Sequence, residues 1–198
     1  MMTCQSLFKT LVLPSLLIVT LFTSFGCGKP EMDTRQAAIE LNEPKSDATK
    51  ERDEKFMVQA AEINFEEIML AKLAQQRSVN DDFKAMAKML EEYHRTANVD
   101  LRALAMQKSI AVPTAATNKV MEDYNQLNLE PVKEFEDAYF TMIIQNHETA
   151  INKFESYTSG PCDDAIKSWA VGLIPQMRIH LQKVMDVQNG ISNPVSML

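Results

Sequence analysis

Apolar side chains recur at alternating steps of three and four residues along four long stretches of this chain, and this spacing limits the fold more than any other feature. Such spacing puts the apolar side chains on one face of an α-helix, which must be buried against other helices. With only 5 Gly and 8 Pro among 198 residues, little in the chain interrupts a helix. Four helices of about 25 residues, each with one apolar stripe, make a four-helix bundle, so the predicted fold class is all-α. The predicted helices cover residues 53–77, residues 80–108, residues 130–158 and a last stretch that ends before 189–190.

The connections between these helices set their relative directions. Residues 78–80 form a tight turn in which Asn80 caps the second helix, so the first two helices make an antiparallel hairpin. Residues 109–128 are longer than a usual connection in a bundle, and they predict a long crossover that contains a short helix. Glu130-Pro131 is predicted to be the cap and the first residue of the third helix.

The first 26 residues have the organisation of an export signal. Lys9 precedes an apolar run over residues 11–25, and small residues lead to Cys27. The run is shorter than the ~20 residues that span a bilayer, so a signal peptide over residues 1–26 is predicted instead of a membrane helix. The sequence SFGC at residues 24–27 resembles the bacterial lipobox, which implies lipidation of Cys27; an ordinary secretory peptide is the alternative.

Lipidation would attach the chain to a membrane at Cys27. Gly28, and not an acidic residue, follows this cysteine, which for lipoproteins of Gram-negative bacteria implies the outer membrane. The expected location is therefore the outer membrane, facing the periplasm, with a free periplasmic or secreted protein as the alternative. Residues 27–52 mix charges without an apolar period and predict a flexible tether; residues 53–188 would form the bundle and residues 189–198 a tail.

Charge and motif content exclude several classes of function. The chain has 27 acidic and 20 basic residues, a net charge of -7, which repels phosphate backbones and argues against nucleic-acid binding. With Cys4 removed in the signal and Cys27 acylated, Cys162 alone is left, so an internal disulfide is excluded. The sequence contains no HExxH, CxxC, GxSxG, GxGxxG or P-loop pattern. It therefore gives no support for a zinc protease, a dithiol redox protein, a serine hydrolase or a nucleotide-binding protein. No feature indicates a particular protein partner.

All three histidines fall on the apolar stripes, one on each of the last three predicted helices, and Glu67 lies within the stripe of the first. A charged Glu in an apolar core is costly unless it is paired, protonated or bound to metal. His94 is the expected partner, because the two residues lie ~18 and ~21 Å from the turn between their helices. Imidazole and carboxylate groups suit Zn, Fe, Mn or Cu. The predicted metal ligands are Glu67, Glu91, His94, His147 and His180.

The spacing of these residues matches a di-iron bundle only in part. Glu91 and His94 form a Glu-x-x-His pair, which is half of the helix motif that such a centre uses. The fourth helix has Met177 three residues before His180, where a second carboxylate would be needed. Counting the helical rise also predicts that His147 and His180 differ in depth by ~10 Å, more than one ion bridges. The sequence therefore indicates a capacity to bind metal without defining a single four-ligand site.

Three segments carry a family resemblance, and they occur in the chain in the family's order. They are KFMVQAAEINFEEIMLAKLAQQRSVNDDFKAMAKMLEEYHRTANVDLRALA, FEDAYFTMIIQNH and IKSWAVGLIPQMRIHLQKV. Together they resemble a bacterial family of predicted outer-membrane or periplasmic proteins of unknown function in the ferritin-like superfamily, over about residues 53–187. Tyr93-His94 stands where the family usually has Asp-His, which removes one carboxylate beside His94. The resemblance implies a ferritin-like four-helix fold and an exported, often lipid-anchored protein, and it implies no settled activity.

Two hypotheses of function follow from the residues and the resemblance. In the first, the chain is a cell-envelope lipoprotein whose interior Glu/His cluster binds a metal ion, and whether it is an enzyme stays open. In the second, it is a non-catalytic envelope module for interaction or structure, and its buried His and Glu only stabilise the core.

Overall fold

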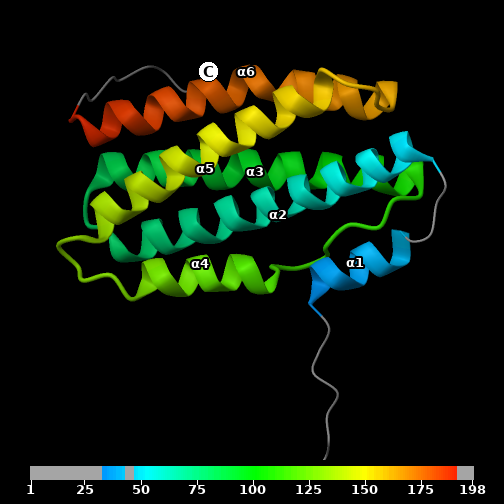
Figure 1. Ribbon diagram of the computed structural model, residues 1–198. Helices are drawn as coiled ribbons and strands as arrows, with labels where there is room; N and C mark the ends of the chain where they lie inside the picture. The colour runs from blue at the N-terminus through cyan, green and yellow to red at the C-terminus, as the bar shows by residue number, and fades with distance from the viewer. Residues whose placement is uncertain (1–32, 43–46, 191–198) are drawn as a thin grey trace, which may run out of the picture. The chain divides into compact units, whose positions relative to one another are not determined.

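The structure is all-helical. It is a computed structural model that describes residues 33–42 and 47–190, and these residues form six helices and no strand (Figure 1). The all-α prediction is confirmed for this part of the chain. None of the helices there has the length and apolar character needed to cross a membrane. The helices are α1 (Thr34–Asn42), α2 (Ala48–Arg77), α3 (Asp81–Lys108), α4 (Asn118–Asn128), α5 (Phe135–Thr158) and α6 (Asp164–Gln188).

Most predicted helix ends agree with the structure because capping side chains mark them. Asn80 precedes α3 and its side-chain oxygen accepts hydrogen bonds from the backbone N–H groups of Asp82 and Phe83. The crossover after α3 contains the short helix α4, as predicted, with Thr117 as its cap. Helix α6 ends at the predicted stop, where Gly190 has a positive φ of 69°.

The predicted start of the third helix is wrong. Glu130-Pro131 was expected to open this helix, whereas α5 begins at Phe135. The N–H of Glu134 donates to the carbonyl of Pro131, three residues earlier, so this segment closes a single tight turn before the helix begins. Arg77 holds the same segment, because its guanidinium donates to the carbonyl of Glu130.

The predicted tether is helical over most of its described residues. Helix α1 lies inside the predicted range 27–52, and α2 begins at Ala48. Long-range contacts fix α1 to the rest of the chain: Asn42 donates to the carbonyl of Ala111, and the Ala111 N–H donates to Asn42. Thr34 also donates to the carbonyl of Ala115, and Arg35 pairs with Glu62. A short polar helix can gain this stability from long-range contacts that its own sequence period does not reveal. The predicted signal peptide, Cys27 and most of the predicted C-terminal tail lie outside the described residues.

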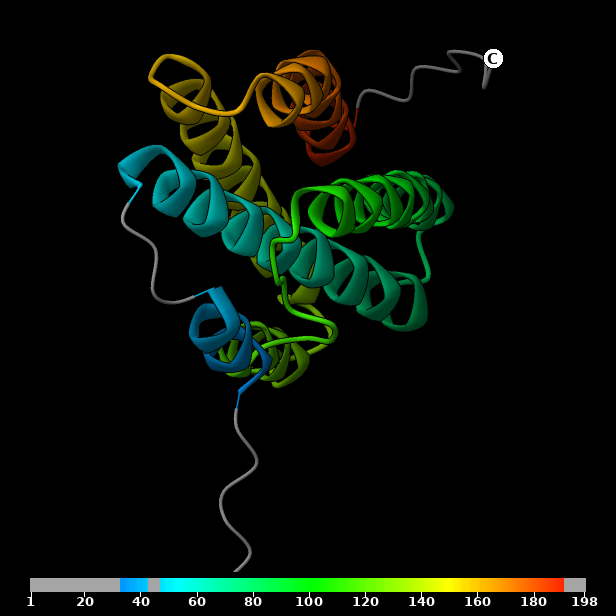
Figure 2. The same cartoon turned by 90° about the vertical axis from the view of Figure 1, so that its right-hand side faces the viewer.

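The four long helices pack side by side. Helix α2 contacts α3 and α5, and α6 contacts α3 and α5, so the cyclic order is α2, α3, α6, α5 (Figure 2). The short helix α4 contacts α2 and α5, and α1 contacts α2 (Figure 1). Each long helix therefore turns one stripe toward the interior that all four share.

That interior contains two separate apolar clusters. The Phe56 cluster is built from buried residues Phe56, Met57, Ala60, Ala61, Leu101, Ala105, Ile110, Ala150, Ile151, Phe154, Tyr157, Ile166, Ala170, Ile174 and Met177. The Phe83 cluster is built from buried residues Leu70, Ala71, Leu73, Ala74, Phe83, Met86, Ala87, Leu90, Leu127, Phe135, Tyr139, Phe140, Ile143 and Val184. Along every long helix a short stretch of sequence separates the members of one cluster from those of the other.

Arginine side chains hold both ends of α2. Arg52 donates to the carbonyls of Ser156 and Tyr157 at the C-terminal end of α5, and its guanidinium lies 5.0 Å from the Tyr157 ring centroid. Arg77, at the other end, donates to the last carbonyls of α4 and lies 4.3 Å from the Phe135 ring centroid. Both contacts satisfy carbonyls that have no partner within their own helix, and both add a cation–π interaction.

Candidate metal centre

A polar layer separates the two apolar clusters, and we call it the histidine layer. It consists of Asn64, Glu67, His94, His147 and His180. Helix α2 supplies the first two residues, and α3, α5 and α6 supply one histidine each. The three histidines are between 1% and 3% exposed, so all are removed from solvent.

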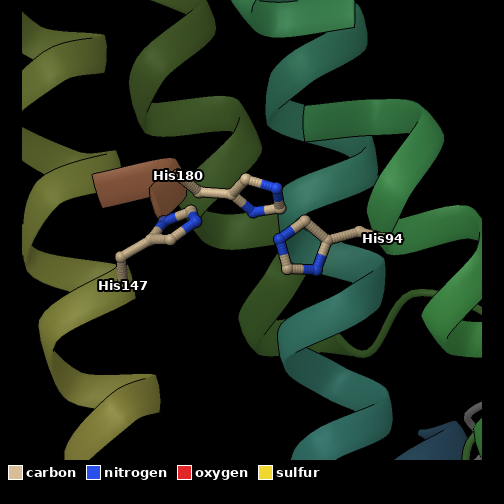
Figure 3. Close-up of side chains that lie close together, drawn as sticks. All are labelled: His94, His147 and His180. Atoms are coloured by element: carbon tan, nitrogen blue, oxygen red, sulfur yellow. The ribbon is translucent and has the colours of Figure 1, made fainter. Parts of the chain in front are cut away.

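The three imidazole rings converge, although they come from three helices. One ring nitrogen from each can be chosen so that all three lie within 4.8 Å of one another. The ring centroids of His94 and His147 are 5.7 Å apart, and those of His147 and His180 are 5.9 Å apart. Figure 3 shows the rings turned toward one another.

The predicted difference of ~10 Å in depth between His147 and His180 is therefore wrong. Counting from a turn assumes that both helices start level and run straight along one axis. Residues 159–163 connect α5 to α6, and a connection of this length lets the two helices be staggered. Side chains that reach along and across the interior close the remaining distance.

Each histidine uses one ring nitrogen for a contact that fixes the orientation of its ring. His94 Nδ1 lies 3.0 Å from Asn64 Oδ1, and His147 Nδ1 lies 3.1 Å from the carbonyl oxygen of Ile143. Both oxygens are acceptors, so Nδ1 carries the proton in each ring and Nε2 keeps a lone pair. His180 Nε2 lies 3.0 Å from the side-chain amide of Gln176.

The second ring nitrogen of each histidine has no hydrogen-bond partner among the described residues. These atoms are His94 Nε2, His147 Nε2 and His180 Nδ1, and all three are buried. A buried polar atom that has lost its water without gaining a partner costs about 1–3 kcal/mol. Three such atoms on converging rings are the donor set that a single metal ion would satisfy.

Glu67 contacts a different histidine from the one predicted. Its Oε1 lies 3.4 Å from His147 Nδ1, while His94 pairs with Asn64. Glu67 Oε2 is buried and has no hydrogen-bond partner among the described residues. A carboxylate behind a histidine in this way orients the ring and supplies charge to balance a cation bound on its other side.

Burial and Glu67 set the charge state of the layer. Burial lowers the pKa of His94 to about 4 and that of His180 to about 3, so both rings are neutral and able to donate a lone pair at neutral pH. Burial also acts to lower the pKa of His147, but the neighbouring Glu67 carboxylate outweighs it and the pKa is raised. In the same pair, burial acts to raise the pKa of Glu67 and contact with His147 holds it below its usual value.

The structure does not bring Glu91 into the layer. The carboxylate of Glu91 accepts hydrogen bonds from Gln75 at 2.8 Å and from Arg95 at 2.9 Å. Of the five predicted ligands, three histidines converge, Glu67 lies directly behind one of them, and Glu91 lies apart. The Glu-x-x-His spacing puts Glu91 and His94 on roughly the same side of α3. Glu91, however, forms ion pairs with Lys72 and Arg95 near the surface and does not join the layer.

Sequence reasoning missed two tyrosines at this layer. The Tyr93 ring centroid lies 4.3 Å from that of His180, and the Glu67 charge acts on Tyr139. Both hydroxyls are buried and have no hydrogen-bond partner among the described residues. Burial raises the pKa of Tyr93 to about 12, and it raises that of Tyr139 with a further contribution from Glu67, so both phenols stay protonated. A tyrosine adjacent to a stripe histidine, as in Tyr93-His94, is the signal that was present in the sequence.

A small change in geometry would let the layer hold an ion. In a tetrahedral zinc site with Zn–N bonds of about 2.0–2.1 Å, nitrogen pairs lie about 3.4 Å apart. One ring nitrogen from each histidine lies within 4.8 Å of the other two, so binding would require these nitrogens to approach by up to about 1.4 Å. Ligation through His180 Nδ1 would also require the Gln176 amide to turn its oxygen toward Nε2, because that nitrogen would then carry the proton.

Comparison with known proteins places this chain in a family. The family model described as "Domain of unknown function (DUF4142)" matches residues 39–187. The match covers most of the chain and every residue of the histidine layer, and the chain belongs to this family. No curated protein and no solved structure matched the chain.

Proposed function

For this member of a family without a known function, we propose that the histidine layer binds one divalent first-row transition-metal ion. The observation that carries the proposal is the convergence of three buried ring nitrogens that have no hydrogen-bond partner among the described residues. Zinc and its neighbours in the row take imidazole nitrogen readily, whereas Mg²⁺ and Ca²⁺ require oxygen ligands.

Each residue of the layer has a role in this proposal. His94 Nε2, His147 Nε2 and His180 Nδ1 are the ligand atoms. Asn64 and Glu67 lie behind two of the rings, where they fix orientation, and the Glu67 carboxylate balances charge. Three protein ligands leave a coordination position open, and an ion with an open position can polarise a bound molecule or lower the pKa of a bound water.

Fold and location complete the proposal. The cyclic packing of four long helices around an interior donor set supports a ferritin-like four-helix bundle. The apolar run before Cys27 supports a lipoprotein of the cell envelope, anchored at that cysteine. Metabolic labelling with a radioactive fatty acid, lost in a Cys27→Ser variant, is the expected result for the anchor.

The decisive experiment is elemental analysis of the chain purified from its own host without an affinity tag. We expect one equivalent of Zn, Fe, Mn or Cu per chain, and its loss in a His94→Ala/His180→Ala variant. A His94→Gln/His180→Gln variant, checked for helicity by circular dichroism, separates loss of ligands from loss of folding. A Glu91→Gln variant is the matched control, because Glu91 lies outside the layer and the metal content should not change.

The second hypothesis, a structural polar layer, makes the opposite prediction. Two of the histidines have a side-chain partner on another helix, Asn64 or Glu67 of α2, which favours a role in holding the helices together. Well-folded protein that contains none of the four metals, and takes up none when they are added at micromolar concentration, would falsify metal binding in favour of this hypothesis.

A further inference from the structure

A pocket on one side of the molecule reaches the histidine layer. It has a volume of about 350 Å³ and is lined by residues of α2, α4 and α5, which contact one another, together with Arg35 of α1. Its charged lining residues are three acids, Glu62, Glu66 and Glu67, and three bases, Arg35, Lys119 and Lys153. Lys119 forms an ion pair with Asp123. Glu62 pairs with Arg35 and accepts a hydrogen bond from Thr117, so its charge is already compensated.

Glu67 belongs to both the pocket and the layer. The residue is among those that line the pocket, and its Oε1 lies 3.4 Å from His147 Nδ1. Its Oε2 is buried and has no hydrogen-bond partner among the described residues. An unpartnered carboxylate oxygen on a residue that belongs to both the pocket and the layer is a group that a cation can contact on its way in.

Glu66 lies at the outer part of the same route. Its Oε1 accepts a hydrogen bond of 2.7 Å from Asn146 Nδ2, which leaves the second carboxylate oxygen for another contact. Glu66 and Asn146 also line a neighbouring pocket of about 440 Å³, which follows α4 and α5 and is more polar. The exposed residue Thr149 lines both pockets. The two pockets therefore meet at Glu66.

We propose that this pair of pockets is the entrance through which an aquated divalent cation reaches the histidine layer. Glu66 receives the ion where the pockets meet, and Glu67 passes it to the imidazoles. Replacement of water by carboxylate oxygen in two stages lowers the cost of dehydrating the ion before it reaches nitrogen ligands. The inference rests on the proposed function, because an entrance needs a site behind it.

The test measures the rate of Zn²⁺ uptake separately from the amount bound. Metal-free full chain is mixed with Zn²⁺ and a chromophoric chelator, and the transfer is followed by stopped-flow absorbance. Glu66→Gln removes the carboxylate and keeps the shape of the side chain, so Asn146 can still donate to it. Burial raises the pKa of Glu66 to about 7, so uptake is measured at about pH 8, where the wild-type carboxylate is charged. Thr149→Trp narrows both pockets from an exposed position. Glu148→Trp is the matched control, because Glu148 is the exposed neighbour on α5 and lines neither pocket.

We expect Glu66→Gln to slow uptake about tenfold, the low end of the effect of a charged cleft on association rates, because the pocket also contains basic side chains. Thr149→Trp should slow it further, and both variants should still bind one equivalent. Unchanged uptake rates in both, equal to that of Glu148→Trp, would overturn the entrance while leaving the metal site intact. Loss of the bound equivalent in Glu66→Gln would also overturn it, because Glu66 would then be a ligand. A wild-type chain that binds no Zn²⁺ would overturn the proposed function itself.

Discussion

The histidine layer and the Phe83 cluster occupy neighbouring turns of the same helices, yet the buried rings of the two regions differ in the contacts that they make. In the Phe83 cluster, aromatic rings pack edge to face: the Phe83 centroid lies 5.0 Å from that of Tyr139 and 5.1 Å from that of Phe140. In the histidine layer, three rings approach within 6.0 Å, and each leaves one nitrogen without a partner among the described residues. The rings of the apolar cluster satisfy one another by packing, whereas the nitrogens of the layer would gain their missing partner from the proposed metal ion.

The largest expected effect on the free energy of unfolding comes from a substitution in the Phe83 cluster. Phe83→Ala should lower the free energy of unfolding by about 3–5 kcal/mol, because it leaves a cavity among packed rings. The metal equivalent should remain, since Phe83 contributes no ligand. Urea unfolding and elemental analysis measure the two quantities on one sample. Val79→Ala, at a residue that is 93% exposed, serves as the control with little effect. Loss of the metal in folded Phe83→Ala would mean that the two regions are not independent.

The next effect concerns affinity. Asn64→Ala removes the acceptor behind His94 and should weaken Zn²⁺ binding about 10- to 100-fold, the usual cost of losing such a partner. Competition with a chromophoric chelator gives the dissociation constant. Gln75→Ala is a matched control on α2, because Gln75 bonds to Glu91, outside the layer. Equal affinities for the two variants would show that Asn64 does not orient a ligand.

A smaller effect of opposite sign is expected for the layer in the absence of metal. His180→Leu should leave the free energy of unfolding unchanged or raise it by about 1 kcal/mol, because it removes a buried unpartnered nitrogen. By contrast, Ile166→Val, on the same helix in the Phe56 cluster, should cost about 0.5–1.5 kcal/mol. Urea unfolding of the two metal-free variants beside wild type checks both values. Marked destabilisation by His180→Leu would favour the structural hypothesis for the layer.

The pH dependence of stability reports on the histidine layer and not on the Phe83 cluster. The buried His94 and His180 have pKa values of about 4 and 3, against 6.5 in an unfolded chain, so unfolding takes up protons below pH 6.5. Stability of the metal-free protein therefore falls as pH drops from 6.5 toward 4.5. The raised pKa of His147 affects stability only near and above pH 6.5, so between pH 6.5 and 4.5 His94 and His180 together set the slope, at most about 2.7 kcal/mol per pH unit. Urea unfolding across this range measures the slope, which should be about half as steep in His180→Leu because only His94 then contributes.

The sequence predicted the long helices well because each has a sustained apolar period, and side chains of Asp47, Asn80 and Asp163 cap three of them. Asn80 and the break at residues 159–161 are local signals, and the structure follows both. Helix α1 and the start of α5 were not predicted, because long-range contacts decide them. The Asn42 pairing with Ala111 joins residues 69 positions apart, and Arg77 reaches Glu130 across 53 positions.

The sequence predicted most residues of the candidate site but not the contacts between them. Burial of Glu67 and the three histidines follows from the apolar stripes, and the structure places all four side by side. Which of them touch depends on helix stagger, and neither the Glu67 contact with His147 nor the convergence of His147 with His180 could be derived by counting turns. Glu91 was assigned by motif spacing, which does not account for competition from Gln75 and Arg95.

The two arginine contacts of α2 have a consequence for how the length of this chain can vary. Arg52 and Arg77 fix the ends of a segment whose middle supplies Asn64 and Glu67. Insertion or deletion of one residue between them would turn one half of α2 by about 100° relative to the other. Either Arg52 or Arg77 would lose its hydrogen bonds to backbone carbonyls, or Asn64 and Glu67 would turn away from the histidine layer. We therefore expect functional length variants to have their insertions in the loops between helices, and this segment of α2 to keep a constant number of residues.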